Sequence, residues 1–469
     1  MNIAKIFLAY LQLFSAAMFL TLPLYSECHA QTKNTDFREL EAVAAQEIKD
    51  TNTPGAAVVI VKGDRIIFAK GFGVSNIETG SPVTTDMLFR IGSLTKPFTA
   101  ATLVSLAEEG KIKLDAPVAD RVKGLSEKLG QVTPHQLLSH TAGLQDGARP
   151  YGLHDETGLA TTVRTWKDDL LFTDPGKIFS YSNLGYAVAG VTIEEVSGKP
   201  FADQLDERLF KPLGMKRATF RPTVAMTYPL AQGHQARGGE KPSVVRPFTD
   251  NVADWAAGFM FASADDLARF AIAFMNEGRI DGKQVLQPSV IKKLSAPYAD
   301  IPGFDIKYGY GLRIENHRGV QIVEHGGAIA GFGAQLRMVP EHQFAIVVLG
   351  NKSGARLEKT VERAMEMLLP LKAKTASKPP QPISMSEAEM TSYTGNYVHS
   401  SRANIEIVTQ NGKLFWKRRD DLFPLVKVGN LRFMIPSPDP NELEEFVLIP
   451  DSDGKAEYLH MDGRGYRKR

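Results

Sequence analysis

The alternation of apolar and polar residues changes character several times along the chain and predicts a protein of mixed helices and strands. Behind the capping pair Thr35-Asp36, apolar side chains recur at helical spacing, which predicts a helix over residues 36–50. Residues 56–62 and 65–70 are rich in apolar side chains and flank a Gly63-Asp64 turn. A helix followed by a β-hairpin is therefore expected.

A second helix is expected from Ser93 to about Glu109, with Gly110 ending it. Residues 115–300 mix Pro, Gly and short helical patterns, and periodicity alone does not order this stretch. Strand patterns return in three further segments, residues 320–325, 334–339 and 344–349. A helix follows them, because apolar residues then recur at helical spacing: Leu357, Val361, Ala364 and Leu368.

The chain changes composition near residue 372. Residues 373–386 contain several prolines and no apolar period, which is typical of an extended linker. Beyond it, apolar strand-like runs flank Asn411-Gly412, the strongest short hairpin signal. Residues 387–469 are therefore expected to form an antiparallel meander, closed into a small β-barrel that folds and can be removed independently.

The first thirty residues predict export. A nearly continuous apolar stretch, residues 6–24, follows Lys5, and small residues precede a cleavage point after Ala30. A secretory signal cleaved there would make the protein periplasmic or extracellular. The alternative is an uncleaved anchor, because the stretch could nearly span a bilayer, and only then is contact with a membrane expected. Cleavage would also remove Cys28, the only cysteine.

Composition excludes several classes of partner. The 469 residues carry 55 Lys and Arg against 53 Asp and Glu, so no global field favours nucleic acid. A mature chain without cysteine has no thiolate nucleophile and no cysteine-ligated metal. No cofactor or metal is therefore expected, and the expected partner is a small-molecule or peptide-like substrate. The sequence does not predict the oligomeric state.

The chemistry is indicated by Ser93-Leu94-Thr95-Lys96, a Ser-x-x-Lys motif at the start of a predicted helix. Residues three apart share a helix face, so the Lys96 amine can reach the Ser93 oxygen. An amine surrounded by other donors is more readily kept neutral and can then accept a proton. By itself this motif is common by chance, and a capping serine with a solvated lysine is the plain alternative.

Two later motifs strengthen the interpretation. Tyr181-Ser182-Asn183 supplies a tyrosine that can act as a base near a cationic lysine, and an amide that can position both lysine and substrate. His325-Gly326-Gly327 is expected to end a strand, where glycines let a substrate lie along the backbone. The plain alternatives are a core tyrosine and a flexible turn.

In this order the three motifs resemble the serine β-lactamase-like superfamily, and most closely its branch of class C β-lactamases, DD-peptidases, D-aminopeptidases and esterases. The resemblance covers roughly residues 36–370. It extends to three further segments, residues 87–92, 137–144 and 258–263.

The resemblance implies a fold and a set of roles. The fold is an α/β (α+β) domain over residues 31–372, with an antiparallel sheet flanked by helices, an inserted helical lobe and the site at their junction. Residues 387–469 resemble the lipocalin-like barrel that some members append. The implied catalytic residues are Ser93, Lys96 and Tyr181. The implied substrate-binding residues are Asn183, His325, Gly327 and Ala328, with the oxyanion hole formed by the N–H groups of Ser93 and Ala328.

The leading functional hypothesis is an exported serine hydrolase that forms an acyl-enzyme on Ser93 and acts as an esterase, amidase or peptidase on small or peptide-like substrates. A β-lactamase or a DD-carboxypeptidase acting on peptidoglycan is the first alternative. A non-catalytic protein that binds peptidoglycan or lipid is the second. Because His325-Gly326-Gly327-Ala328 carries neither a lysine nor a hydroxyl, neutral substrates are expected to be preferred over carboxylates.

Overall fold

The computed structural model describes residues 35–147, 149–236, 240–375, 380–399, 401–435 and 444–469. The predicted signal peptide, residues 1–30, lies outside the described residues, as does part of the predicted linker. The boundaries at residues 372 and 387 remain predictions.

Nine strands form one sheet in the order β10-β11-β12-β13-β14-β15-β1-β2-β3, and every pair of neighbours is antiparallel. The predicted hairpin is β1 and β2, and the three later strand patterns are β13, β14 and β15. All but the last residue of β1 are buried, which explains its continuous apolar run. The strands are β1 (Gly55–Lys62), β2 (Arg65–Asn76), β3 (Ser81–Pro82), β10 (Ala299–Asp300), β11 (Ile306–Tyr308), β12 (Arg313–His317), β13 (Val320–Ile329), β14 (Phe332–Val339) and β15 (Phe344–Gly350).

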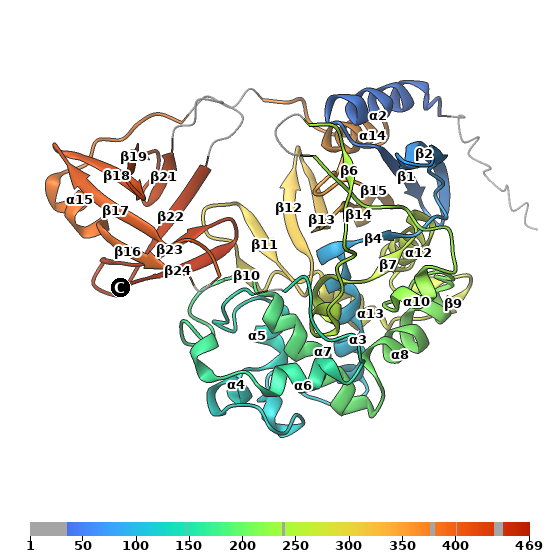
Figure 1. Cartoon of the computed structure of the whole chain (residues 1–469), viewed down its shortest axis with the longest axis horizontal. Coiled ribbons are helices and arrows are strands. Elements are labelled where there is room, and N and C mark those ends of the chain that lie inside the picture. The colour runs from blue at the N-terminus through green and yellow to red at the C-terminus, as the bar shows by residue number, and fades with distance from the viewer. Residues whose placement is uncertain (1–34, 148, 237–239, 376–379, 400, 436–443) are drawn as a thin grey trace, which may run out of the picture. The chain divides into compact units, whose positions relative to one another are not determined.

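Helices from both ends of this domain cover the sheet (Figure 1). Helix α12 (Ala264–Met275) packs on β1 and β15. The predicted first helix is α2 (Arg38–Asp50), and the helix after β15 is α14 (Glu358–Leu368). The buried Glu47 carboxylate joins these two helices, because it accepts the N–H groups of Lys359 at 2.9 Å and Thr360 at 2.8 Å at the start of α14.

The expected helical lobe lies between two short paired strands, β4 (Phe89–Arg90) and β7 (Phe261–Ala262). Its central helix is α7 (Asn183–Ser197), capped by Ser182 and packed against α3 (Lys96–Glu108), α5, α6 and α8. The other helices discussed are α5 (Pro134–Leu138), α6 (Gly158–Arg164), α8 (Phe201–Leu205) and α11 (Trp255–Gly258).

The helix expected from Ser93 begins differently. Residues Gly92–Thr95 form a 3₁₀ turn, η1, and the α-helix α3 runs over Lys96–Glu108. In an α-helix the N–H of residue 97 would donate to the carbonyl of Ser93, but Pro97 has no N–H. The α-helical hydrogen bond to Ser93 is therefore missing. The nucleophile predicted from sequence therefore lies on a tight turn ahead of the helix.

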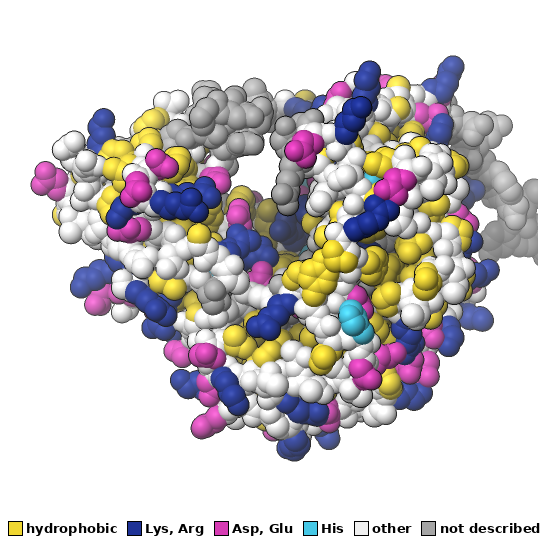
Figure 2. Space-filling model, in the orientation of Figure 1, with side chains coloured by type: hydrophobic (Ala, Val, Ile, Leu, Met, Phe, Trp, Pro, Cys, Tyr) yellow, Lys and Arg dark blue, Asp and Glu magenta, His cyan; other side chains and the backbone are white. Residues whose placement is uncertain are grey.

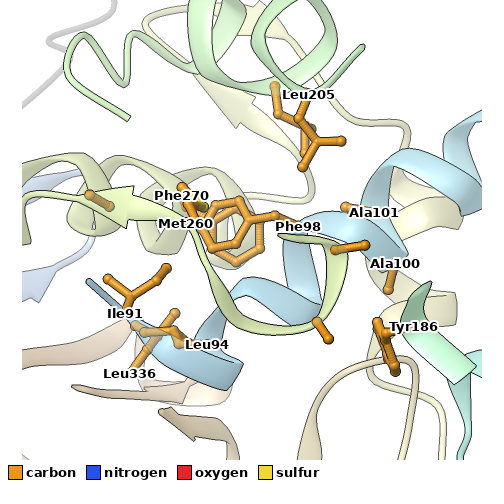
Figure 3. Packing of buried hydrophobic residues seen from close by; sticks show 14 of the residues in the cluster. Ile91, Leu94, Phe98, Ala100, Ala101, Tyr186, Leu205, Met260, Phe270 and Leu336 are labelled. Carbon is orange, nitrogen blue, oxygen red and sulfur yellow. The ribbon is translucent and has the colours of Figure 1, made fainter. Parts of the chain in front are cut away.

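Helix α3 passes through the main hydrophobic core. Figure 3 shows Phe98 projecting from α3 toward Phe270 of α12, and their ring centroids are 4.4 Å apart. Ile91 and Leu94, on either side of Ser93, are completely buried in the same cluster as Leu336 of β14. The turn that carries Ser93 is therefore anchored in the core on both sides.

The C-terminal residues form the expected barrel, which is nearly closed. Its nine antiparallel strands lie in the order β19-β18-β17-β16-β24-β23-β22-β21-β20. Asn411 and Gly412 both have positive φ, as the predicted tight hairpin between β17 and β18 requires. The strands are β16 (Gly395–Val398), β17 (Ile405–Gln410), β18 (Lys413–Arg418), β19 (Asp421–Pro424), β20 (Val426–Lys427), β21 (Arg432–Ile435), β22 (Glu444–Pro450), β23 (Ala456–Met461) and β24 (Arg464–Lys468).

The surface carries mixed charge. Figure 2 shows Lys and Arg side chains interspersed with Asp and Glu over the face it presents. Among the residues that the structure describes, none of the helices combines the length and the apolar character needed to cross a membrane.

Replacing Phe98 should destabilise the domain strongly. Phe98 is fully buried against Phe270, so Phe98→Ala leaves a cavity and is expected to lower the free energy of unfolding by about 3–5 kcal/mol. Urea denaturation followed by tryptophan fluorescence measures this change. Phe304→Ala is the matched control, because Phe304 is 49% exposed and should cost less than about 1 kcal/mol. Equal losses in the two variants would contradict the assignment of the core.

Candidate active site

The turn carrying Ser93 and strand β13 approach so closely that each needs a glycine. A Cβ on Gly327 would lie 1.8 Å from the Ile91 carbonyl oxygen, and a Cβ on Gly92 would lie 2.7 Å from the Ala328 nitrogen. This approach brings the Ala328 backbone beside the nucleophile turn, as the predicted oxyanion hole requires. The expectation that His325 ends its strand is wrong, since β13 continues to Ile329 and pairs with β14 from Val323 to Ile329.

Lys96 carries a fully buried amine with three polar neighbours. Its Nζ donates to Asn183 Oδ1 at 2.7 Å and to the Ala257 carbonyl at 2.7 Å, and it lies 3.4 Å from Ser93 Oγ. Burial of a charged amine is costly unless such acceptors surround it. Two acceptors therefore hold Lys96 in place while its third direction faces the serine hydroxyl, the geometry that proton transfer between them requires.

Tyr181 lies beside this pair with its ring toward Lys96. The Lys96 Nζ is 4.6 Å from the ring centroid, and the Tyr181 side chain stacks on His140 with centroids 4.2 Å apart. Within the described part of the chain, no hydrogen bond joins the Tyr181 hydroxyl to Ser93 or Lys96. The structure thus brings Tyr181 to the site, and its role as a base remains a prediction.

Asn183 connects Lys96 to an acidic residue that the sequence analysis did not single out. Its Nδ2 and backbone N–H donate to Asp146 Oδ1 at 2.9 and 3.0 Å. Asp146 is only 9% exposed. Burial opposes its ionisation, but the Arg464 guanidinium and the Asn183 N–H outweigh this and hold the pKa of the carboxyl below its usual range. A buried carboxylate thus lies one side chain away from Lys96.

Two buried histidines line the other side of the site and share one tyrosine. The Tyr308 hydroxyl lies 3.1 Å from His325 Nε2 and 3.2 Å from His140 Nε2. Burial, together with the Lys96 charge, lowers the pKa of both histidines well below the usual range, so both are neutral near pH 7. His140 Nδ1 accepts the Ser182 N–H at 3.1 Å, so this ring fixes the backbone ahead of α7.

The C-terminal barrel contacts residues of this site, and the expectation that it can be removed independently remains a prediction. The Gly463 carbonyl, in the turn between β23 and β24, accepts the Tyr181 N–H at 2.8 Å. Arg464 Nη2 donates to Asp146 Oδ2 at 2.8 Å, and the Arg464 guanidinium lies 4.6 Å from the Tyr181 ring centroid. A chain ending near Pro379 would lose these contacts.

A cavity of about 600 Å³ opens onto Ser93. It is lined by the predicted residues Tyr181, Asn183, His325 and Ala328, whereas Gly327 is covered by the nucleophile turn. The lining also includes charged residues that no sequence spacing indicates, because they come from β12, β13, the segment around α14 and the barrel: Arg313, Glu324, Arg356, Glu358, Asp462 and Arg464.

Comparison with known proteins gives consistent matches. The family model described as Beta-lactamase matches residues 40–366. Penicillin-binding protein 4 of Amycolatopsis lactamdurans is 32% identical over 313 residues, which is 64% of this chain and 81% of that protein. A D-aminopeptidase of Gluconobacter oxydans (strain 621H) is 28% identical over 319 residues, and the match spans 64% of this chain and 56% of that protein. The crystal structure of SurE superimposes with a TM-score of 0.75 at 25% identity, covering 92% of this chain and 99% of SurE.

Lys96 and Tyr181 should act as one unit because Lys96 Nζ lies 4.6 Å from the Tyr181 ring. Lys96→Ala and Tyr181→Phe are each expected to lower turnover by about 10²–10⁴, and the double variant should lose little more than the worse single one. The wild-type protein, the two single variants and the double variant form a double-mutant cycle. Steady-state kinetics on a chromogenic ester measures the turnover of each. Lys70→Ala, at an exposed ion pair with Glu41, is the control and should retain activity. Losses that simply multiply would indicate independent roles.

Proposed function

Because the chain belongs to the Beta-lactamase family, we propose that it is an exported serine hydrolase that forms an acyl-enzyme on Ser93. The observation that carries this proposal is the buried Lys96 amine, which two acceptors hold 3.4 Å from the Ser93 hydroxyl. Export rests on the composition of residues 1–30 and is part of the same proposal.

In the proposed first step, neutral Lys96 accepts the Ser93 proton while Ser93 Oγ attacks the substrate carbonyl carbon. The carbonyl oxygen gains the negative charge, and the N–H groups of Ser93 and Ala328 stabilise it. The carbon–leaving-group bond then breaks, and the leaving amine or alcohol takes a proton from the Lys96 and Tyr181 pair. Water next attacks the acyl-enzyme, releases the acid and returns the proton to Ser93.

Amide and ester bonds of small or peptide-like substrates fit this site best. The names of the relatives, a penicillin-binding protein and a D-aminopeptidase, support an acyl-transfer reaction on such compounds. A protein that only binds its ligand has no need of a buried lysine directed at a serine hydroxyl, since burial of the amine is itself costly. Turnover is therefore preferred over the hypothesis of a binding protein.

Arg356 bears on the expectation, drawn from the sequence, that neutral substrates are preferred over carboxylates. Gly326 lacks the hydroxyl that related enzymes use to bind a carboxylate, but a Cβ on Gly326 would lie 3.0 Å from the Arg356 guanidinium carbon. Arg356 thus fills the space beside the third motif and lines the cavity. Among the residues that the structure describes, no carboxylate forms an ion pair with the Arg356 guanidinium, whereas Glu324 is paired with Arg337 at 2.7 Å.

We therefore infer that Arg356 binds a free substrate carboxylate. This replaces the expectation, drawn from the third motif alone, that the protein prefers neutral substrates. This favours peptides with a free C-terminus, and it keeps a carboxypeptidase or a β-lactamase as the second candidate function. Glu358 also lines the cavity, but its side chain is 58% exposed and lies 3.7 Å from Arg337, so its charge is screened.

Covalent labelling tests the proposed function. A fluorophosphonate should add its mass to the peptide that contains Ser93, and Ser93→Ala should abolish labelling and lower ester hydrolysis by a factor on the order of 10⁴. Mass spectrometry of the digested protein locates the adduct. Labelling of another residue, together with full activity of Ser93→Ala, would refute the proposed nucleophile.

The role of Arg356 is tested with a matched pair of substrates, a peptide with a free C-terminus and its amide. The protein should prefer the free acid, and Arg356→Met should lower kcat/KM about ten- to a hundredfold for the acid and little for the amide. The preference should persist from pH 6 to 8, because the guanidinium stays charged and the lowered pKa of His325 keeps that ring neutral. Arg65→Met, on the exposed start of β2, is the control. A preference of the wild-type protein for the amide would restore the neutral-substrate expectation.

A further inference from the structure

Arg464 is an arginine of the barrel that lines the active-site cavity and binds Asp146. Its Nη2 and Nε lie 2.8 and 3.1 Å from Asp146 Oδ2, and its side chain in this ion pair is 19% exposed. The backbone on either side of it is fixed as well, because the Gly465 N–H donates to Ser180 Oγ at 3.1 Å and the Gly463 carbonyl accepts the Tyr181 N–H. The guanidinium is therefore held at a defined position.

A continuous chain of hydrogen bonds runs from Arg464 to the catalytic amine. Arg464 donates to Asp146 Oδ2, Asp146 Oδ1 accepts from Asn183 Nδ2, and Asn183 Oδ1 accepts from Lys96 Nζ. The two charges at its ends, on Arg464 and Lys96, are both positive, and the carboxylate lies between them. Each cation thus competes for the stabilisation that one buried carboxylate provides.

This competition matters because Lys96 must be neutral to accept the Ser93 proton. A carboxylate that has no other counterion stabilises a nearby ammonium and opposes its deprotonation. With Arg464 in place, the charge of Asp146 is already balanced, and the amine is less strongly held in its protonated form. The same ion pair keeps Asp146 ionised, so that Oδ1 remains an acceptor for Asn183.

We propose that Arg464 is a positioning residue of the hydrolase: the barrel places a guanidinium on Asp146, and this contact sets the protonation of Lys96 and the orientation of Asn183. The inference rests on the proposed function of Ser93 and Lys96. It makes the C-terminal barrel part of the active site, so that a chain lacking residues 387–469 should be inactive on small esters.

Other titratable groups surround Lys96 and Asp146, and the experiment must separate them. Those that face this pair from the neighbouring elements are Tyr181, Tyr186, His140, His325, Asp254 and His399. Burial lowers the pKa of His140 and His325 well below 6.5, and the pKa of His399 to about 4, so the histidines do not titrate near neutrality. Burial raises the pKa of Asp254 to about 6, which places its titration on the acidic side of the profile.

The experiment measures the pH dependence of kcat/KM for a neutral ester with full-length variants. In Arg464→Ala the rising limb is expected to move up by about one pH unit, and kcat should fall about ten- to a hundredfold at pH 7 while KM changes less than about threefold. Arg464→Lys should restore most of the activity, because the ammonium can still balance Asp146. Arg467→Ala is the control on the same strand, since Arg467 is exposed and its side chain donates to the Phe172 carbonyl, away from Asp146.

A second substitution distinguishes electrostatics from loss of structure. In Asp146→Asn the carboxylate is absent, so adding Arg464→Ala should leave the rising limb where it is in Asp146→Asn alone. If Arg464→Ala does not fold, Arg464→Gln gives the same test, because glutamine keeps a hydrogen-bond donor but lacks the positive charge. The inference would be overturned if the rising limb stayed in place in both Arg464→Ala and Arg464→Gln. It would also be overturned if Arg464→Ala shifted the limb equally with Asp146 present and with Asp146→Asn. Fluorophosphonate labelling of the wild-type protein at Ser93 is read in parallel: its failure would refute the proposed function, whereas its success with an unshifted profile would refute only the role of Arg464.

Discussion

The site depends on the burial of one amine. Lys96 is inaccessible to solvent, and a buried charge is tolerated only where hydrogen-bond acceptors replace water. Those acceptors come from the start of α7, through Asn183, and from α11, through the Ala257 carbonyl. The packing of the helical lobe against α3 is therefore what surrounds the Lys96 amine with acceptors.

A second constraint is the contact between two backbones. The turn at Gly92 and strand β13 at Gly327 are so close that a methyl group on either would meet a main-chain atom. Ile91 and Leu94 anchor the turn in the core, and pairing with β14 fixes the strand. The position of Ser93 relative to the Ala328 backbone is thus set by packing, by the sheet and by the buried Thr95 hydroxyl, which donates to the Gly92 carbonyl at 2.7 Å. Such rigidity is what a preorganised oxyanion hole requires.

Local signals predicted much of this molecule. The Asn411-Gly412 turn needs positive φ at two residues, and the motif residues Ser93 and Lys96 are three positions apart, so both could be read from neighbouring residues. The 3₁₀ turn at Ser93 was not predicted, because helical periodicity does not distinguish it from the first turn of an α-helix. Arg464 and Asp146 lie 318 positions apart, and only the docking of the barrel brings them together. No periodicity or spacing carries that information.

The charge balance around Asp146 is the physical basis for the proposal that the barrel contributes to the active site. Its Oδ1 accepts from three neutral donors, the N–H groups of Gly147 and Asn183 and the Asn183 amide. Neutral donors satisfy hydrogen-bonding capacity but leave a full negative charge in a buried position. If Lys96 alone balanced that charge, the amine would be held as an ammonium, which is the protonation state that cannot accept a proton from serine. A guanidinium resolves the conflict, since it supplies the balancing positive charge that the neutral donors lack. The barrel therefore supplies the one kind of group that lets an acidic residue orient Asn183 without stabilising the wrong form of Lys96.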